Sequence, residues 1–371
     1  MKKVYLQDSN ILSPLGFTTA ANFDAVFAGE TSIKEHSIHS KLGNSYVSIF
    51  DQDRLANLFN QLGISNDSSR IEKLAIAALK PLIDKKAPGR KSLLVVTTTK
   101  GNIKALADSD ELNTYIPSLA KHISNYFGFV TEPLTLSNAC VSGLMALSLA
   151  KRYIQMGMFD DAYIVAFDEV STFVQSGFQS FQAISTEACR PYDALRKGVS
   201  LGEAATACYI STEKNSDSIQ IAADSSINDA NHISGPSRTG EGLFLSIQKA
   251  MQEADISADE IDYIVGHGTA TLYNDEMEAI AFNRAGLRNT PLASYKGNYG
   301  HTLAASGLLE CILMATCLRK DTLLASKGFE TLGTSEYINV LVNNMQAPIR
   351  TALKTASGFG GSNTALLLMK S

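Results

Sequence analysis

The sequence contains no hydrophobic run long enough to cross a membrane. Its longest apolar stretch, residues 307–318, has twelve residues and includes Glu310. The N-terminus also lacks the apolar core of a signal peptide, because Gln7, Asp8 and Asn10 interrupt the residues that follow the two initial lysines. The sequence therefore predicts a chain with neither a membrane span nor a secretion signal.

Cysteine is scarce and irregularly placed. The five cysteines, at positions 140, 189, 208, 311 and 317, form no C-x-x-C pair, which disfavours a disulfide framework or a zinc ribbon and fits a reducing cytoplasm. A basic excess is missing as well: the net charge is −5, which argues against nucleic-acid binding. With 45% hydrophobic and 19% charged residues, the composition is that of a globular protein.

Continuous apolar runs alternate with segments of helical periodicity along the whole chain. Such alternation predicts an α/β fold with largely buried sheets. A polar stretch near the midpoint, residues 212–217, separates two apolar runs, and we interpret it as the join between two similar halves. The main expected strands are residues 92–98, 161–167, 204–210, 218–223, 262–265, 338–342 and 363–369, and the main expected helices are residues 20–28, 70–83, 115–127, 241–253, 275–282 and 307–318.

The stretch around Cys140 reads as a strand, a sharp turn and a helix. An apolar run ends at Leu136, Cys140 follows in the turn, and a helical run begins after Gly143. Unpaired N–H groups and the positive end of a helix dipole favour a thiolate and predict a lowered pKa. Cys140 is therefore a candidate nucleophile; a small buried hydrophobic residue is the alternative.

Two histidines occur in glycine-rich motifs. His267 lies in GHGTAT, at the carboxyl end of an expected strand, where α/β proteins place catalytic groups. His301 lies in SYKGNYGHTLAASG, together with Lys296 and four small residues, 304–307, that would let another segment approach closely. Alone, each motif could also be a structural loop. A third loop, SGFGGSN at residues 357–363, could aim N–H groups at an oxyanion or form a simple turn.

Together these residues suit acyl transfer followed by stabilisation of an enolate. A thiolate can form a thioester, two histidines can polarise a second carbonyl group, and a glycine loop can supply N–H donors. A metal site made of Cys140, His267 and His301 is chemically possible, but Lys296 beside them would oppose a cation.

The chain resembles the elongating, Cys-His-His type of β-ketoacyl-acyl carrier protein synthase, in the condensing-enzyme (thiolase) superfamily. The third member of the triad reads Gly300-His301-Thr302, whereas initiating members have asparagine there. Seven segments match in the family's order: ILSPLGFTTAANFDAVFAGETSI, NACVSG, RPYDALRKGVSLGEAA, DANHISGPSRTGEG, GHGTATLYNDEMEA, KGNYGHTLAASG and SGFGGSNT.

The resemblance implies a thiolase-like α/β fold. Two similar βαβαβαββ halves, residues 1–212 and 213–371, would form a five-layered α-β-α-β-α core. Cys140 would then come from the first half and both histidines from the second, so that the site lies between the halves.

The resemblance also implies residue roles. Cys140 would accept the acyl group, while His267 and His301 would bind the extender's thioester carbonyl and assist decarboxylation, supported by Lys296. The remaining roles fall on supporting acids (Asp275 and Glu310), on oxyanion-hole N–H groups (Cys140 and Phe359, the latter also a gate) and on substrate contacts (Thr269, Thr271, Phe178 and His232).

The implied reaction is a decarboxylative Claisen condensation of malonyl-carrier protein with a Cys-bound acyl group. It needs no metal or organic cofactor, because the phosphopantetheine of an acyl carrier protein holds the substrates. The implied partners are that carrier and a second subunit, in a homodimer or a heterodimer with a related ketosynthase.

The pathway and the role of the subunit remain open in the sequence. The resemblance implies fatty-acid or polyketide-type biosynthesis, and the short length and residues 229–242 look closer to aryl-polyene or flexirubin ketosynthases. Gln182 occupies a position where relatives often carry a carrier-binding arginine, and Arg70 and Lys73 could replace it. The alternative function is a non-elongating, chain-length-factor-like partner of another ketosynthase, which the intact Cys-His-His-Lys set disfavours.

Overall fold

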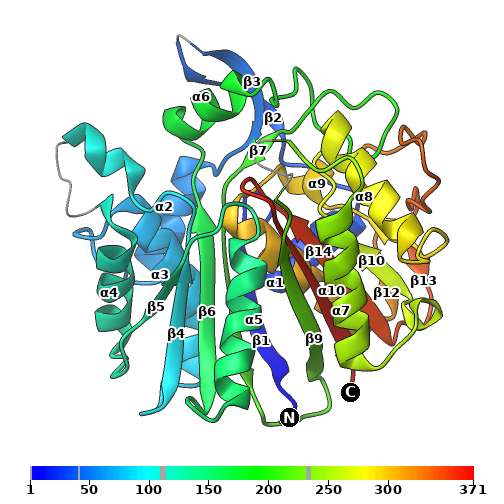
Figure 1. Cartoon of the computed structure of the whole chain (residues 1–371). Helices are drawn as coiled ribbons and strands as arrows, with labels where there is room; N and C mark the ends of the chain where they lie inside the picture. The colour runs from blue at the N-terminus through cyan, green and yellow to red at the C-terminus, as the bar shows by residue number, and fades with distance from the viewer. Residues whose placement is uncertain (1, 41, 109–113, 231–234) are drawn as a thin grey trace.

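Strands and helices alternate along the chain in a computed structural model (Figure 1). The structure describes residues 2–40, 42–108, 114–230 and 235–371. The first half contains β1 (Tyr5–Leu12), α3 (Arg70–Lys85), β4 (Ser92–Thr97), α4 (Ile116–Phe127), β5 (Leu134–Leu136), α5 (Ser142–Gln155), β6 (Asp161–Asp168) and β8 (Ala204–Ser211). The second contains β9 (Ile219–Asn228), α7 (Glu241–Ala254), β10 (Tyr263–Val265), α8 (Leu272–Arg284), β11 (Leu292–Ala293), α10 (Ala304–Lys320), β14 (Thr351–Ser357) and β15 (Ser362–Lys370).

The two halves repeat one topology. The strand order in the main sheet is β11-β10-β14-β15-β9-β1-β8-β6-β4-β5, so each half arranges its own five strands as third, second, fourth, fifth, first. In each half the second strand pairs in parallel with the third and the fourth. The fifth strand pairs antiparallel with both the fourth and the first. Within the main sheet, β1 and β9 join the halves through two residue pairs. This repeat agrees with a division at residues 212/213, which we keep as an interpretation.

Helices and strands form five layers. Helix α3 packs on β1, β6 and β8, and α7 packs on β9, β14 and β15, with α8 against α7. Helices α5 and α10 contact each other and strands of both halves, and Figure 1 shows α5 between β6 and β9. Three hydrophobic clusters follow this plan, one around the central helices and one on each outer side. The expected α-β-α-β-α core is therefore confirmed.

Small residues allow the two central helices to meet near their N-termini. A Cβ atom on Gly143 would stand 2.4 Å from the carbonyl oxygen of Ala304, and one on Gly307 would stand 3.0 Å from Cβ of Leu144. The close approach expected for residues 304–307 is thus confirmed. Its consequence is that the turns preceding α5 and α10 lie side by side.

Local signals explain the ends of several expected elements. Ser69 and Glu72 form a capping box at the start of α3, and Gly128, in the left-handed conformation, ends α4. All residues of β4 are buried, as its continuous apolar run predicts. None of the helices in the described ranges is both long and apolar enough to cross a membrane.

The expected strand at residues 338–342 is wrong. These residues form a single bridge, between Val340 and Leu292, and otherwise run as an irregular segment beside β11, in which Ile338, Val340 and Leu341 are buried. Helix α1 (Thr19–Phe27) matches the expected helix at residues 20–28. Several other elements were not predicted: β2 (Lys34–His39), β3 (Gly43–Ser48), α2 (Gln52–Gln61), α6 (Thr172–Ser180), β7 (Leu201–Gly202), β11, α9 (Lys296–Tyr299), β12 (Thr322–Leu323), β13 (Met345–Gln346) and β14.

Candidate active site

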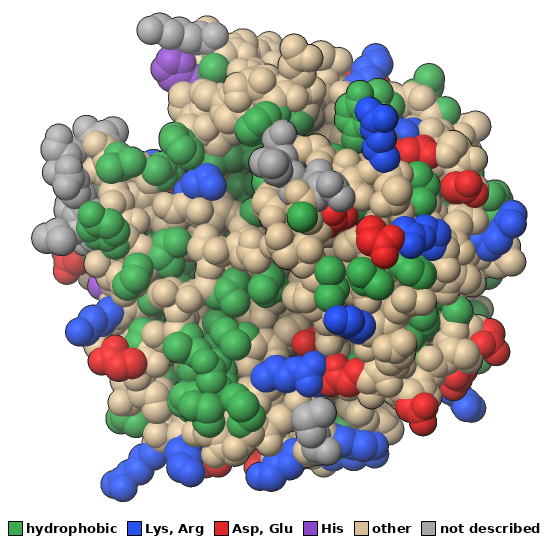
Figure 2. Space-filling view, in the orientation of Figure 1, with side chains coloured by type: hydrophobic (Ala, Val, Ile, Leu, Met, Phe, Trp, Pro, Cys, Tyr) green, Lys and Arg blue, Asp and Glu red, His purple; other side chains and the backbone are tan. Residues whose placement is uncertain are grey.

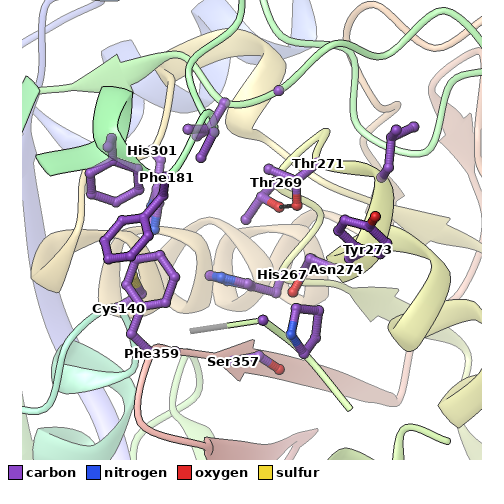
Figure 3. A pocket seen from close by; sticks show the side chains of 18 of the residues that line it. Cys140, Phe181, His267, Thr269, Thr271, Tyr273, Asn274, His301, Ser357 and Phe359 are labelled. Carbon is purple, nitrogen blue, oxygen red and sulfur yellow. Dashed lines mark hydrogen bonds between the residues drawn. The ribbon is translucent and has the colours of Figure 1, made fainter. Parts of the chain in front are cut away.

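Three chain turns bring Cys140, His267 and His301 to one cavity of about 310 Å³ (Figure 3). Cys140 lies between β5 and α5, His267 two residues after β10, and His301 between α9 and α10. The two imidazole rings are nearly perpendicular, with centroids 5.3 Å apart. The cavity therefore combines residues from both halves.

The backbone is strained at all three turns. Seven non-glycine residues in the described ranges have positive φ, and three of them are Ala139 (43°), Ala270 (63°) and Leu303 (53°). Ala139 precedes Cys140, Ala270 follows His267 by three residues, and Leu303 follows His301 by two. Such conformations are uncommon and costly for L-residues, and they concentrate at functional sites. The backbone thus marks this cavity independently of side-chain chemistry.

Burial dominates the electrostatics of the candidate nucleophile. Cys140 is only 6% exposed, and burial raises the pKa of its thiol to about 12, while the charge of Lys296 acts in the opposite direction and that of Asp168 adds to the rise. The expectation of a lowered pKa is therefore wrong. Helix α5 begins at Ser142, with Val141 as its N-cap, so Cys140 lies outside the first turn, where the dipole is strongest.

His301 is held as a neutral base. Burial, with the charges of Lys296 and Lys354, keeps its pKa well below 6.5. Its Nδ1 lies 3.1 Å from the hydroxyl oxygen of Ser306, and its backbone N–H donates to the carbonyl oxygen of Ser200 at 2.6 Å. Nε2 is buried without a hydrogen-bond partner. A buried, unpartnered ring nitrogen in a cavity is available to a substrate.

Lys296 lies behind His267 and does not line the cavity. Its Nζ donates to the carbonyl oxygen of His267 at 2.5 Å and to Oε1 of Glu310 at 2.7 Å. Lys296 and Glu310 therefore form a buried ion pair behind the cavity. Because Lys296 is fully buried, it reaches a substrate only through the residues it holds.

Two acids of α8 hold the GHGTAT turn. Asp275 accepts hydrogen bonds from the N–H groups of Thr269 (3.0 Å) and Tyr192 (2.7 Å), and burial raises its pKa to about 7. Glu278 accepts from the N–H of His267 at 2.7 Å. Sequence reasoning missed Glu278, although it follows Asp275 by three residues and so shares its helix face.

Aromatic rings close the cavity beside Cys140. The ring of Phe359 lies 5.8 Å from that of Phe178 and 5.3 Å from that of Phe181, which the sequence did not single out. The Phe359 loop also touches the nucleophile turn, because a Cβ on Gly358 would stand 3.3 Å from the backbone nitrogen of Cys140. Figure 3 shows Phe181 and Phe359 grouped in front of Cys140.

Polar residues line the opposite wall. The hydroxyl oxygens of Thr269 and Thr271 are 2.9 Å apart, and Tyr273 stands exposed beside them. His232 lies outside the described residues, so its expected contact is not described. The structure thus places Phe178, Thr269, Thr271 and Phe359 around the cavity.

Two other expectations concern ligands and partners. Among the described residues, no group of three or more His, Cys, Asp or Glu is arranged to hold a metal ion, so the geometry gives no support to the metal alternative. Arg70 is already engaged by the buried carboxylates of Glu169 and Glu203, the latter at 2.8 Å. Arg70 is therefore poorly suited to contact a carrier protein.

Family models match both halves of the chain. Residues 94–216 match the beta-ketoacyl synthase N-terminal domain, and residues 220–330 match the beta-ketoacyl synthase C-terminal domain. Together the two matches cover more than half of the sequence. The chain belongs to the beta-ketoacyl synthase family, and its α/β architecture is the thiolase-like fold of that family.

Individual relatives agree with this assignment. The chain is 30% identical to 3-oxoacyl-[acyl-carrier-protein] synthase 2 of Rhizobium meliloti over 252 residues, which cover 62% of this chain and 59% of that protein. It is 25% identical to the synthase of the same name from Vibrio cholerae over 419 aligned positions, which cover 100% and 99%. The chain spans less than two thirds of the length of the first curated relatives that it matches.

A solved structure shares the whole fold. The complex of the ketosynthase ApeO with its chain length factor ApeC, from Xenorhabdus doucetiae, contains a chain that superposes with a TM-score of 0.89 at 25% identity. The superposition covers 100% of this chain and 98% of that one.

Proposed function

We propose that this protein is a β-ketoacyl-acyl carrier protein synthase that catalyses a decarboxylative Claisen condensation. The observation that carries the proposal is the meeting of Cys140, His267 and His301 at one cavity between the two halves. Family membership supports the same reaction class.

In the first step, the sulfur of Cys140 attacks the carbonyl carbon of an acyl thioester. A new C–S bond forms, the bond to the phosphopantetheine sulfur breaks, and the thiol proton leaves with that sulfur. The oxyanion of the tetrahedral intermediate would accept hydrogen bonds from the N–H groups of Cys140 and Phe359. Because burial raises the pKa of the Cys140 thiol, its proton must move during the attack, and the neutral Nε2 of His301 is a suitable temporary acceptor.

In the second step, a malonyl thioester binds with its carbonyl oxygen against His267 and His301. The C–C bond to the carboxylate breaks, CO2 leaves, and its electron pair forms an enolate. The enolate carbon then attacks the acyl carbon on Cys140, which breaks the C–S bond and releases the β-ketoacyl product. The sulfur of Cys140 leaves as a thiolate and takes up a proton from solvent, which restores the thiol. Lys296, Glu310, Asp275 and Glu278 would act by holding the GHGTAT turn, and Thr269 and Thr271 by contacting the substrate arm.

The test uses Cys140→Ala with a panel of acyl thioesters and malonyl-carrier protein. We expect condensation to be lost and malonyl decarboxylation to persist, because the histidine side of the cavity stays intact. Cys208→Ala removes another buried thiol, from β8, and should condense like the wild type. Undiminished elongation by Cys140→Ala would overturn the assignment.

A second candidate is a non-elongating partner subunit. It is favoured only by the likeness to a complex that contains a chain length factor. Mass spectrometry after incubation with acyl-carrier protein separates the two, because the enzyme should carry an acyl adduct on Cys140 and the partner subunit should not.

The carrier, the second subunit and the pathway are parts of the same proposal. Figure 2 shows hydrophobic side chains gathered over α5 and the neighbouring strands, which is compatible with a second subunit in a homodimer or heterodimer. We keep fatty-acid or polyketide-type biosynthesis as the process, with aryl-polyene or flexirubin synthesis as its narrower form. A cytoplasmic location also stays a prediction.

A further inference from the structure

A lysine in the middle of β14 has no place in the scheme above. Lys354 is fully buried, and its Nζ lies within reach of four oxygen atoms. It donates to the carbonyl oxygens of Val265 (3.2 Å), Gly266 (3.0 Å) and Thr355 (2.7 Å) and pairs with Oε2 of Glu310 at 2.7 Å. Burying a charge this completely is costly, so its partners must compensate for lost water.

We propose that Lys354 is a positioning residue, which holds the end of β10 so that His267 meets the cavity in a fixed orientation. The proposal deepens the proposed function, on which its activity measurement rests. It assigns no contact with substrate to Lys354.

The two carbonyl groups bound by Lys354 immediately precede His267. They belong to Val265, the last residue of β10, and to Gly266, where the strand becomes the GHGTAT turn. Val265 is also the direct parallel partner of Lys354 in the sheet. The ammonium group therefore fixes the direction in which the chain leaves the sheet, one residue before the histidine.

Charged side chains also hold the backbone of His267 itself. Lys296 binds the carbonyl oxygen of His267, and Glu278 binds the N–H groups of His267 and Gly268 (2.7 and 2.6 Å). Charged side chains thus hold consecutive backbone groups on both sides of the histidine. Such rigid support matters because a displacement of about 1 Å at a reacting group can lower a rate about a hundredfold.

Glu310 connects the two lysines. One of its carboxylate oxygens binds Lys296 and the other binds Lys354, each at 2.7 Å. Removing Lys354 therefore takes a donor from three carbonyl groups and also loosens the acid that orients Lys296. The displacement should be largest at His267, because Val265 and Gly266, whose carbonyl groups lose their donor, immediately precede it. The lost charge of Lys354 should also raise the pKa of His301.

The test compares Lys354→Met with a matched control, Lys151→Met. Lys151, on α5, is equally buried and pairs with Asp224 (2.8 Å) and Glu253 (3.2 Å), but it does not line the cavity. With malonyl-carrier protein, Lys354→Met should lower kcat for decarboxylation about 10- to 100-fold, with KM within about threefold of the wild-type value. Lys151→Met should keep the wild-type kcat.

A double-variant cycle shows whether the effect passes through His267. In a His267→Gln background, adding Lys354→Met should change kcat less than about twofold, because the positioned group is already absent. An equal fall in both backgrounds, a wild-type kcat in Lys354→Met, or the same loss in Lys151→Met would overturn the proposal. If Lys354→Met does not fold, the double variant Lys354→Met with Glu310→Gln is measured instead. The second change removes a buried carboxylate that would otherwise have lost one of its two lysine partners.

A measurement without turnover separates this proposal from the proposed function. The ring resonances of His267, assigned in the NMR spectrum of histidine-labelled protein by their loss in His267→Gln, should shift in Lys354→Met and stay in place in Lys151→Met. Unshifted resonances would overturn the positioning role even if the enzyme is active. The proposed function alone would be overturned if the His267 resonances shift in Lys354→Met but the wild-type protein neither acylates Cys140 nor decarboxylates malonyl thioester.

Discussion

The thiol of Cys140 should react slowly with alkylating agents at neutral pH in the absence of substrate. Burial raises its pKa from 9.0 to about 12, so the thiolate fraction at a given pH is far below that of an ordinary cysteine. Sequence reasoning from the helix start predicts the opposite, a lowered pKa and a fast reaction. The two expectations differ in sign and can be separated by one pH profile.

The expected magnitude follows from the thiolate fraction and its reactivity. At pH 8, a pKa of about 12 instead of 9.0 reduces the thiolate fraction from about 0.1 to about 0.0001. A more basic thiolate is also more nucleophilic, with a Brønsted slope of about 0.4–0.5, which recovers a factor of about 15 to 30. Alkylation of Cys140 should therefore be about 30- to 60-fold slower than alkylation of an unperturbed thiol.

The assay is alkylation with iodoacetamide between pH 7 and pH 10, followed by peptide mass spectrometry, which separates Cys140 from the other buried cysteines. The rate should rise tenfold per pH unit without a plateau. Asp168→Asn should accelerate the reaction and Lys296→Met should slow it, because the first charge raises the pKa of Cys140 and the second lowers it. A plateau below pH 9, or equal shifts in both variants, would refute the reasoning.

Three further predictions concern the same site and its support. The ring resonances of His301 should not titrate in NMR spectra between pH 8 and 6.5, because its pKa lies well below 6.5; a midpoint inside that interval would contradict this. Gly143→Ala should lower the free energy of urea unfolding by about 1–3 kcal/mol, since its Cβ would stand 2.4 Å from Ala304 O, whereas Gly177→Ala, with nothing within 4 Å, should not destabilise. Burial raises the pKa of Asp168 from 3.8 to about 6, so its contribution to stability is present below pH 3.8 and is lost as the pH rises through 6. Between pH 4 and pH 7, the free energy of unfolding of Asp168→Asn should therefore rise by up to about 3 kcal/mol relative to that of the wild type. A difference in urea unfolding that does not depend on pH would contradict this.

The layers of the fold could be predicted because most core strands are uniformly apolar. Residues 92–98 and 161–167 read as buried strands and became β4 and β6. The segment 338–342 has a similar apolar character but lies at the margin of the sheet, where only Val340 bridges to a strand. An apolar pattern predicts that a segment is buried, but burial alone does not decide whether the segment pairs with a neighbouring strand.

The candidate site could be predicted as a set of motifs but not as an electrostatic environment. The sequence predicted Cys140 and both histidines from their turns, and the cavity contains all three. It could not predict that Lys296 lies behind His267, or that burial outweighs the helix dipole at Cys140. Those facts depend on how far each side chain lies from water, which only the packed halves determine.

The missed strand and the strained turns have a common cause. Strand β14 was overlooked because TALKTAS places a lysine where a buried strand should be apolar, yet that lysine binds the end of β10. Ala139 and Leu303 likewise adopt backbone conformations that their side chains disfavour, and they flank Cys140 and His301. A locally unfavourable choice persists only where the surrounding structure compensates for it, and here each one supports a candidate reacting group. The positions that local sequence rules fail to explain are therefore themselves an indication of where the chemistry takes place.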